Sequence, residues 1–254
     1  MREHSERNGK MLTQYQFHLK PDQACRVQPE WSYQLYAALL QQAPVDFGTA
    51  AHWDVVTPIS QYLHCRENSV VWTVSLLGES AEQTLGTALE RLDRIELTGK
   101  QIGMRVEQRN CRHIADAEQL FLLAAGHQGL HRLEFLTPTA FKSQGQYVIL
   151  PNTRLILQSL IKKWNGCILE CPIDDADNQG LERMAAGLLC QDYRLQSGRF
   201  TLKGHPIPGF TGQILLENRL SGFHRQMTDA LLLFAEYAGI GIKTTLGMGG
   251  VARI

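Results

Sequence analysis

The same order of strand and helix patterns occurs twice along this 254-residue chain, and no other sequence feature restricts its fold as strongly. Alternating and helically spaced apolar residues in the first half predict a strand, a helix, two strands, a helix and a strand. The second half repeats this order with one extra helix. Such a unit is the ferredoxin-like motif. The sequence therefore predicts an α+β protein with two tandem ferredoxin-like (RRM-like) βαββαβ domains, although no strict sequence repeat accompanies the order.

The pattern also predicts where the elements and domains lie. The expected strands cover 12–20, 55–60, 69–77, 101–108, 131–136, 194–202, 209–218 and 251–254. The expected helices cover 31–43, 80–92, 151–166, 178–190 and 221–238. Ser80 and Gln83 are spaced as a capping box for the second helix. We expect a disordered extension over 1–10, an N-terminal domain over 11–120 and a C-terminal domain with the glycine-rich loop over 128–254.

Composition points to a cytoplasmic protein without a membrane partner. No run of about 18 apolar residues exists, and the polar first ten residues lack the apolar region of a signal peptide. Six scattered cysteines fit a reducing compartment, since a chain of this length has no need of disulfides. Cys167 and Cys171 have metal-like spacing, but no second Cys/His pair follows at zinc spacing, so we interpret them as core residues.

Charge is distributed unevenly although the net charge is zero. Residues 1–128 contain 12 Lys and Arg against 15 Asp and Glu, and residues 129–254 contain 13 against 10. The second half is therefore the positive one. Asp174, Asp175 and Asp177 form an acidic run in a polar loop, which we interpret as a solvated turn or helix-start charge rather than a magnesium site.

The positive half ends in a glycine-rich stretch, Gly239–Gly250, which encloses Lys243 and two threonines directly after an apolar helix. One interpretation is a phosphate cradle, because glycine lets main-chain N–H groups approach an anion closely. The other is a helix C-cap at Gly239 with a tight connection into the last strand. The spacing fits neither a Walker loop nor a dinucleotide fingerprint.

Several stretches resemble one family, the sixth CRISPR-associated protein, the RAMP-superfamily endoribonuclease that processes precursor CRISPR RNA. Gly239–Gly250 is similar to the superfamily's C-terminal signature. Leu133–Lys142, followed by a helix ending at Asn165, is similar to the opening of the family's second domain, and Gly209–Gly212 resembles its later hairpin. The resemblance implies recognition of a CRISPR repeat RNA and one cut per repeat, without a metal or another cofactor.

Two residues of the first half carry the implied catalysis. Ala51-His52 followed by Thr57–Ser60 resembles the family's histidine segment, and Tyr36 stands at its first-helix tyrosine position. Histidine titrates near neutrality and can act as base or acid in 2′-OH attack on a phosphate, and the tyrosine hydroxyl could orient the reacting groups. Some members place a lysine shortly after the histidine, but none follows here. His64 and Arg66 are the reserve candidates.

The expected RNA contacts lie in the second half. They are Lys142, Arg154, Lys162, Lys163, Gly239, Gly241, Lys243, Thr244, Gly247 and Gly249. The expected partner is CRISPR repeat RNA within precursor CRISPR RNA, with a CRISPR effector complex and a homodimer as further possibilities.

Two other functions stay open at this point. The first is a non-catalytic RNA-binding RAMP subunit of an effector complex. His52 is the feature that would distinguish a nuclease from such a subunit. The second is a ferredoxin-like metabolic enzyme or ligand-binding protein that uses the glycine-rich stretch for a phosphorylated small molecule.

Overall fold

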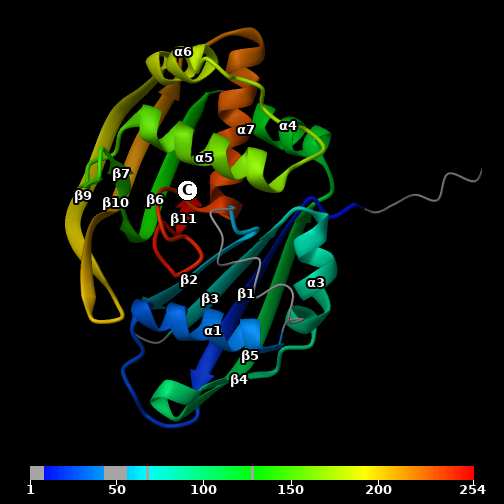
Figure 1. The fold of residues 1–254 in the computed structure, drawn as a ribbon, viewed down its shortest axis with the longest axis vertical. Coiled ribbons are helices and arrows are strands. Elements are labelled where there is room, and N and C mark those ends of the chain that lie inside the picture. Colours follow the sequence, from blue (N-terminus) through cyan, green and yellow to red (C-terminus); the bar gives the residue numbers. More distant parts are fainter. Residues whose placement is uncertain (1–8, 43–55, 67–68, 127–128) are drawn as a thin grey trace, which may run out of the picture.

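The computed structural model describes residues 9–42, 56–66, 69–126 and 129–254 (Figure 1). His52 and most of the extension predicted over 1–10 lie outside these residues. Within the described part of the chain, no helix combines the length and the apolar character that crossing a membrane requires.

The first half forms an antiparallel sheet with strand order β2-β3-β1-β5-β4. Without the edge strand β4, this is the ferredoxin-like order. The elements are β1 (Leu12–Pro21), η1 (Pro29–Trp31), α1 (Ser32–Gln42), β2 (Ile59–Arg66), β3 (Ser69–Leu77), α3 (Glu79–Glu90), β4 (Arg94–Leu97), η2 (Thr98–Lys100) and β5 (Ile102–Ile114).

Alternation along β1 decides the two faces of this sheet. Tyr15 and Phe17 point into a core that includes buried leucines of α1 and α3. The intervening Gln14 lies on the opposite face, where its amide donates to Ser75 Oγ at 2.9 Å and to the Glu236 carbonyl at 2.7 Å. The helix-free face of the first sheet is therefore polar, and part of it contacts the second half of the chain.

The second half forms a second antiparallel sheet, ordered β11-β6-β10-β9. This is again the ferredoxin-like order, and a short β7–β8 hairpin lies beside it. The elements are α4 (Ala117–Ala125), β6 (Leu130–Thr139), β7 (Phe141–Ser143), β8 (Gln146–Val148), α5 (Thr153–Cys167), α6 (Gln179–Gly187), β9 (Leu188–Leu202), β10 (His205–Asn218), α7 (Gly222–Ala238) and β11 (Val251–Arg253).

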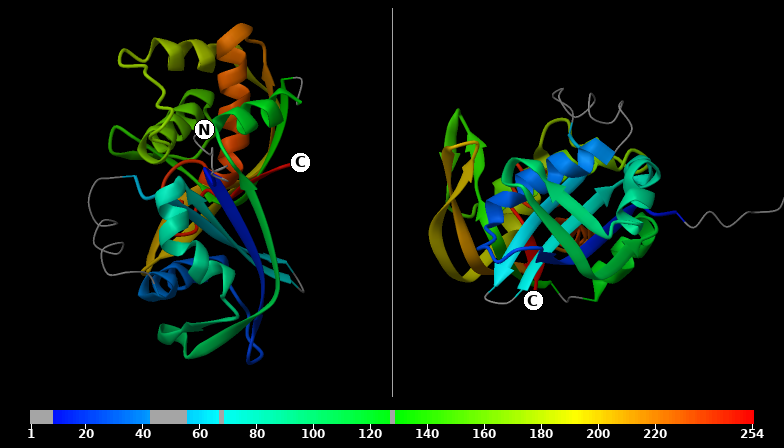
Figure 2. Two further views of the ribbon diagram at one scale, coloured as in Figure 1. Left: turned by 90° about the vertical axis from the view of Figure 1, so that its right-hand side faces the viewer. Right: turned by 90° about the horizontal axis from the view of Figure 1, so that it is seen from below.

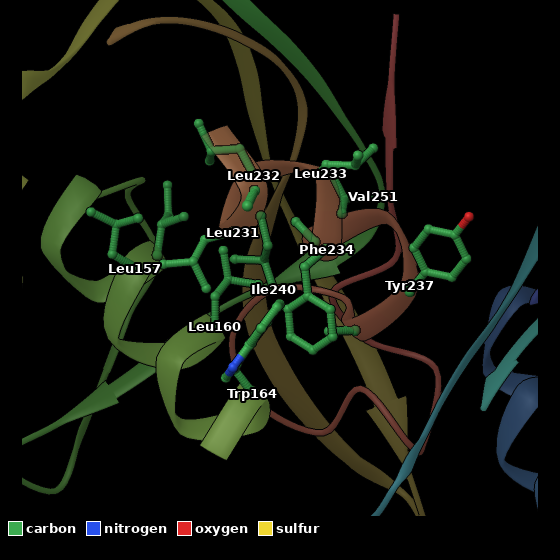
Figure 3. Close-up of a cluster of buried hydrophobic side chains, with 14 of the residues drawn as sticks. Leu157, Leu160, Trp164, Leu231, Leu232, Leu233, Phe234, Tyr237, Ile240 and Val251 are labelled. Carbon is green, nitrogen blue, oxygen red and sulfur yellow. The ribbon is translucent and has the colours of Figure 1, made fainter. Parts of the chain in front are cut away.

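The second core lies between this sheet and helices α5 and α7. Trp164 of α5 meets Phe234 of α7 edge to face, with ring centroids 5.2 Å apart, and both side chains are fully enclosed (Figure 3). Phe135 of β6 and Phe210 of β10 make a similar contact at 4.8 Å. Met11 and Leu12 of the first half belong to the same buried cluster, so the cores of the two halves adjoin.

The structure confirms the α+β class and the two tandem ferredoxin-like units. It differs in detail: β4, α4 and the β7–β8 hairpin were not predicted, and the strand expected over 55–60 is observed at Ile59–Arg66. The capping box is wrong. Gly78 is the N-cap of α3, without a side-chain hydrogen bond, and Ser80 lies inside the helix. The domain boundaries stay predictions.

Residues 239–250, the glycine loop, connect α7 to β11 and dock onto the first half (Figure 2). Ser32 Oγ donates to the Leu246 carbonyl at 3.2 Å, and a Cβ at Gly247 would overlap that hydroxyl. A Cβ at Gly250 would similarly enter the ring of Tyr62. These glycines are therefore required by close approach between the two halves.

We predict that Gly247→Ala destabilises the protein by about 1–3 kcal/mol more than Gly145→Ala, because only the former overpacks its surroundings. Both glycines have positive φ, +108° and +80°, but a Cβ at Gly145 would meet no atom within 4 Å. Gly145→Ala thus reports backbone strain alone. Urea unfolding of the two variants measures the difference, and equal losses would contradict the docking contact.

Candidate functional site

Most N–H groups of the glycine loop donate inside the protein. Gly239 caps α7 by donating to the Ala235 carbonyl, Gly241 donates to Ser159 Oγ, and Gly249 donates to the Pro138 carbonyl. The C-cap interpretation is therefore correct for Gly239. Among the described residues, no acceptor faces the N–H of Lys243, Thr244 or Gly247. Donors for an anion are thus confined to the tip of the loop.

Two lysines flank this tip. Lys243 is exposed and has a left-handed backbone with φ of 55°, whereas the neighbouring Thr244 is 6% exposed. Lys142 is also exposed and follows Ala140, whose carbonyl accepts from Ile242 N–H at 3.0 Å. The structure therefore places Lys142 beside the glycine loop, as an RNA contact would require.

One face of α5 packs against the other side of the loop. Ser159 contacts Gly241, and Lys163 Nζ donates to the carbonyls of Ala238 and Gly239 at 2.8 and 3.0 Å. Lys162 lies next to this face, one turn from Ser159, and its side chain is exposed. Lys162 is thus available to a ligand, whereas Lys163 fixes the end of α7 from inside.

Burial lowers the pKa of Lys163 to about 7, from its ordinary value of 10.5. A neutral amine still has two N–H groups, which suffice for the two carbonyls. No sequence pattern indicates this contact. Lys163 therefore contributes to the site through the position of the glycine loop.

Tyr36 lies on the same face of α1 as Ser32, which contacts the loop. It follows Ser32 by four residues and so stands about 6 Å farther along the helix than the Ser32–Leu246 hydrogen bond. The side chain is 6% exposed and belongs to the first core. Burial raises the pKa of the Tyr36 hydroxyl, which therefore stays protonated at neutral pH.

The segment after α1 is described again from Val56. A Cβ at Gly166, at the end of α5, would press against the Val56 side chain. Val56 therefore lies beside the end of α5 that carries Lys162. His52, four residues earlier, lies outside the described residues, and its place is not part of this geometry.

The reserve candidates, His64 and Arg66, interact with each other. Arg66 Nε donates to His64 Nε2 at 3.0 Å, and a hydrogen bond connects the histidine to the Leu136 backbone. Burial, followed by the nearby Arg66 charge, lowers the pKa of His64. A histidine nitrogen that accepts from a guanidinium is a poor base until the arginine moves. This geometry does not favour His64 as the catalytic histidine.

Two other expectations concern residues away from the loop. Arg154 stands about 12 Å before Lys162 along α5 and pairs with Glu182 Oε1 at 2.5 Å. Asp175 accepts from the N–H groups of Gly180 and Leu181, both at 2.8 Å, and so acts as the predicted helix-start charge. Across the described ranges, no cluster of three or more His, Cys, Asp or Glu could hold a metal ion.

Comparisons with known proteins agree on one family. The sequence model described as CRISPR-associated endoribonuclease Cas6 matches residues 133–251. A CRISPR-associated endoribonuclease Cas6 of Mycobacterium tuberculosis is 31% identical over 222 residues, covering 85% of this chain and 69% of that protein. The Streptococcus thermophilus Cas6 is 28% identical, with 84% and 87% covered. The chain belongs to the Cas6 family.

Solved structures show the same fold. A Cas6 product complex superposes with a TM-score of 0.76 at 22% identity, covering 97% of this chain and 100% of the other. At that identity the likeness concerns the fold alone. It places the two ferredoxin-like units of this chain in the arrangement of other Cas6 proteins.

The residues that hold the Cas6 glycine loop in place escaped the sequence analysis. Ser32 and Gln61 both bond to its carbonyls, and Ser159 accepts from it. Each is a polar residue in an otherwise apolar pattern, which was the only signal available. Such residues become recognisable only when their buried partners are seen.

We predict that Lys163→Met destabilises the protein by about 1–3 kcal/mol, because two carbonyls lose their donor, whereas Lys162→Met is nearly neutral. Because the pKa of Lys163 is about 7 when folded and 10.5 ordinarily, the unfolded chain binds more protons between these values. Wild-type stability relative to Lys163→Met should therefore rise with pH across this window. Denaturant unfolding of both proteins at pH 7 and pH 9.5 measures this. A difference in unfolding free energy between wild type and Lys163→Met that becomes smaller as the pH rises would contradict the prediction.

Proposed function

We propose that this chain is an endoribonuclease that binds CRISPR repeat RNA and cleaves precursor CRISPR RNA within each repeat, by attack of a ribose 2′-OH and without a metal. The observation that supports the proposal is that the glycine loop contacts both α1, through Ser32, and α5, through Ser159 and Lys163. Tyr36 on α1 and Lys162 on α5 each stand about one helical turn from these contacts. Membership of the Cas6 family supports the activity.

The reaction needs three kinds of group. The 2′-oxygen attacks the adjacent phosphorus, the bond from phosphorus to the 5′-oxygen breaks, and a proton moves from the 2′-OH to a base while another reaches the leaving 5′-oxygen. Donors must also stabilise the charge on the phosphate oxygens. The products are a 2′,3′-cyclic phosphate and a 5′-OH end.

We assign the proton transfer to His52, the histidine of the segment between α1 and Val56. Tyr36 acts as a hydroxyl donor to the phosphate or to the nucleophile, because its raised pKa keeps the proton on the oxygen. Lys243 and the free N–H groups at the tip of the glycine loop take the role of the lysine that is missing after His52.

The RNA strand is bound by the exposed cations around this point. Lys142, Lys162 and Lys243 lie on three elements that meet at the glycine loop, and each can contact a phosphate. Lys163 keeps the loop in position, and Arg154 stands farther along α5. The glycines at 239, 241 and 249 serve the site through close packing, since their N–H groups already donate within the protein.

We expect purified protein in EDTA to cut RNA that carries the repeat of its source genome, because no step of the proposed mechanism uses a metal. The product ends should be a 2′,3′-cyclic phosphate and a 5′-OH, and a single 2′-deoxy nucleotide at the cut site should prevent cleavage. Gel analysis with end-group chemistry measures both. Cleavage of the deoxy RNA, or a requirement for magnesium, would refute the mechanism, and tight binding without cleavage would indicate a non-catalytic RNA-binding subunit.

We predict that His52→Ala lowers the single-turnover rate by about 10² or more, the usual scale for removal of a general acid or base, while RNA affinity changes little. Tyr36→Phe should lower the rate less and leave stability almost unchanged. The matched control is His113→Ala, which removes an exposed histidine of β5. Wild-type cleavage by His52→Ala would move the proton transfer to another residue.

A further inference from the structure

A cavity of about 1160 Å³ lies outside the site around Tyr36 and the glycine loop, between the start of α1 and the tip of the β9–β10 hairpin. Figure 1 shows that tip, drawn in gold, beside the start of α1. The last residues of β1 and β2 and the first residues of β3 also line the cavity. We call it the hairpin groove.

The walls of the hairpin groove are positively charged. Among the residues that the structure describes, five cations line it against two acids, Glu30 and Glu107. The cations are Lys20, Arg26, Arg66, Lys100 and Lys203. Lys20 Nζ pairs with Glu107 Oε1 at 3.1 Å, whereas Arg26 is exposed and has no ion pair among the described residues. The excess of positive charge favours a polyanion.

Aromatic rings lie among these charges. Lys203 Nζ stands 5.3 Å from the ring centroid of Tyr33, and Lys100 Nζ stands 4.5 Å from that of Trp31. The contact between an ammonium group and an aromatic ring is weak, so a nucleobase can displace the ammonium from the face of the ring. Any base can stack on an aromatic side chain in this way, irrespective of the nucleotide sequence. Cations and rings together are the side chains that bind single-stranded nucleic acid.

Gln34 lines the groove and has a polar atom without a partner among the described residues. Its Oε1 is covered by the surrounding protein and accepts no hydrogen bond from any residue that the structure describes. Enclosure of an unpaired amide oxygen costs free energy that a donor would recover. The amino groups of adenine, cytosine and guanine are such donors.

The groove is connected to the proposed site through two shared elements, α1 and the β9–β10 hairpin. Phe200 and Ile207 of the β9–β10 hairpin pack against Met248 of the glycine loop, and the same hairpin ends in Lys203. Tyr33 and Gln34 precede Tyr36 on α1 by less than one turn. An RNA that passes the glycine loop can therefore reach the groove along α1 and the β9–β10 hairpin.

We infer that the hairpin groove binds an unpaired segment of the substrate RNA that flanks the cleaved bond, with Arg26 and Lys203 on phosphates, a base on Tyr33 and a base amino group on Gln34, whose side chain turns toward the groove when the RNA binds. This inference rests on the proposed function, since it requires an RNA substrate. It adds a second contact area that anchors the strand at a distance from the reacting phosphate.

The test compares two double variants that lose equal charge. R26M/K203M alters the groove, and the control R91M/R183M removes two exposed cations elsewhere. At about 0.15 M salt, we expect the groove variant to bind repeat RNA about tenfold more weakly, with a salt slope smaller by about 1.4, since each single-strand phosphate contact contributes about 0.7. The cleavage rate at saturating RNA should remain at the wild-type value.

RNA length separates a local contact from a general charge effect. As the repeat RNA is trimmed from one end toward the cut site, the defect of R26M/K203M should disappear, whereas Lys243→Ala should weaken binding at every length. A third variant, Gln34→Met, should bind the long RNA about fivefold more weakly while its thermal stability is unchanged or higher, because an unpaired buried acceptor is removed.

Three results would overturn the inference: equal losses for both double variants, a groove defect that persists on the trimmed RNA, or wild-type RNA affinity for Gln34→Met. The proposed function fails separately. Wild-type protein that binds the RNA tightly but never cuts it would refute the nuclease and leave the groove contact standing, whereas absence of RNA binding would refute both.

Discussion

The buried amide of Gln61 is the interaction on which the relation between the two halves depends. Its backbone N–H donates to the Thr244 carbonyl at 2.9 Å, and its side-chain nitrogen donates to the carbonyls of Thr245 and Ser32. Its side-chain oxygen accepts from the Trp72 indole at 2.8 Å. One side chain that is 1% exposed thus joins the first core, the start of α1 and the glycine loop.

Neither the loss of the Gln61 side chain nor larger residues in the loop that it contacts would be tolerated without a loss of stability. Loss of the amide would remove the partner of the Trp72 N–H and of the Thr245 carbonyl, at about 1–3 kcal/mol for each group. Enlargement of the loop is equally restricted, since its glycines face Ser32 and the ring of Tyr62. The glycine content of the loop therefore follows first from docking. At the tip of the loop, the contacts with the first half involve backbone carbonyls. The N–H groups there are therefore the ones that would remain for an anion.

Periodic apolar patterns were sufficient to predict the fold. Strands β1 and β3 alternate apolar with polar residues because one face packs into the apolar core and the other is polar even where it is buried. Helices α5 and α7 have long apolar stripes. Short elements that lack such a face, including β4 and the β7–β8 hairpin, had no comparable signal. The capping box failed because Gly78, with φ of 90°, already turns the chain into α3 and leaves Ser80 within the first turn.

The candidate site was harder to predict than the fold. Exposed lysines around the loop were recognisable from charge and position, but Lys163 and Lys162 are adjacent in sequence and only their burial separates them. Tyr36 and the docking residue Ser32 lie on the same buried face of α1, so a packing role and a role in the site look alike in the sequence. The two roles can be distinguished only when the hydrogen-bond partner of the side chain is known. For Ser32, Gln61 and Lys163 that partner is a backbone carbonyl, which no pattern of side chains in the sequence reveals.

The docking contacts also determine how the site can work. Tyr36 belongs to the first half, whereas Lys162 and Lys243 belong to the second, so the groups that would surround one phosphate are held together by the Gln61 and Ser32 hydrogen bonds. Lys163 adds a third fixed point, because it holds the carbonyls at the end of α7 where the loop begins. Positioning is worth several kcal/mol in such a reaction, and small displacements of the donors lose it. In the proposed mechanism, the polar residues at this interface would therefore act on the chemistry by positioning the reacting groups, without contacting the RNA themselves.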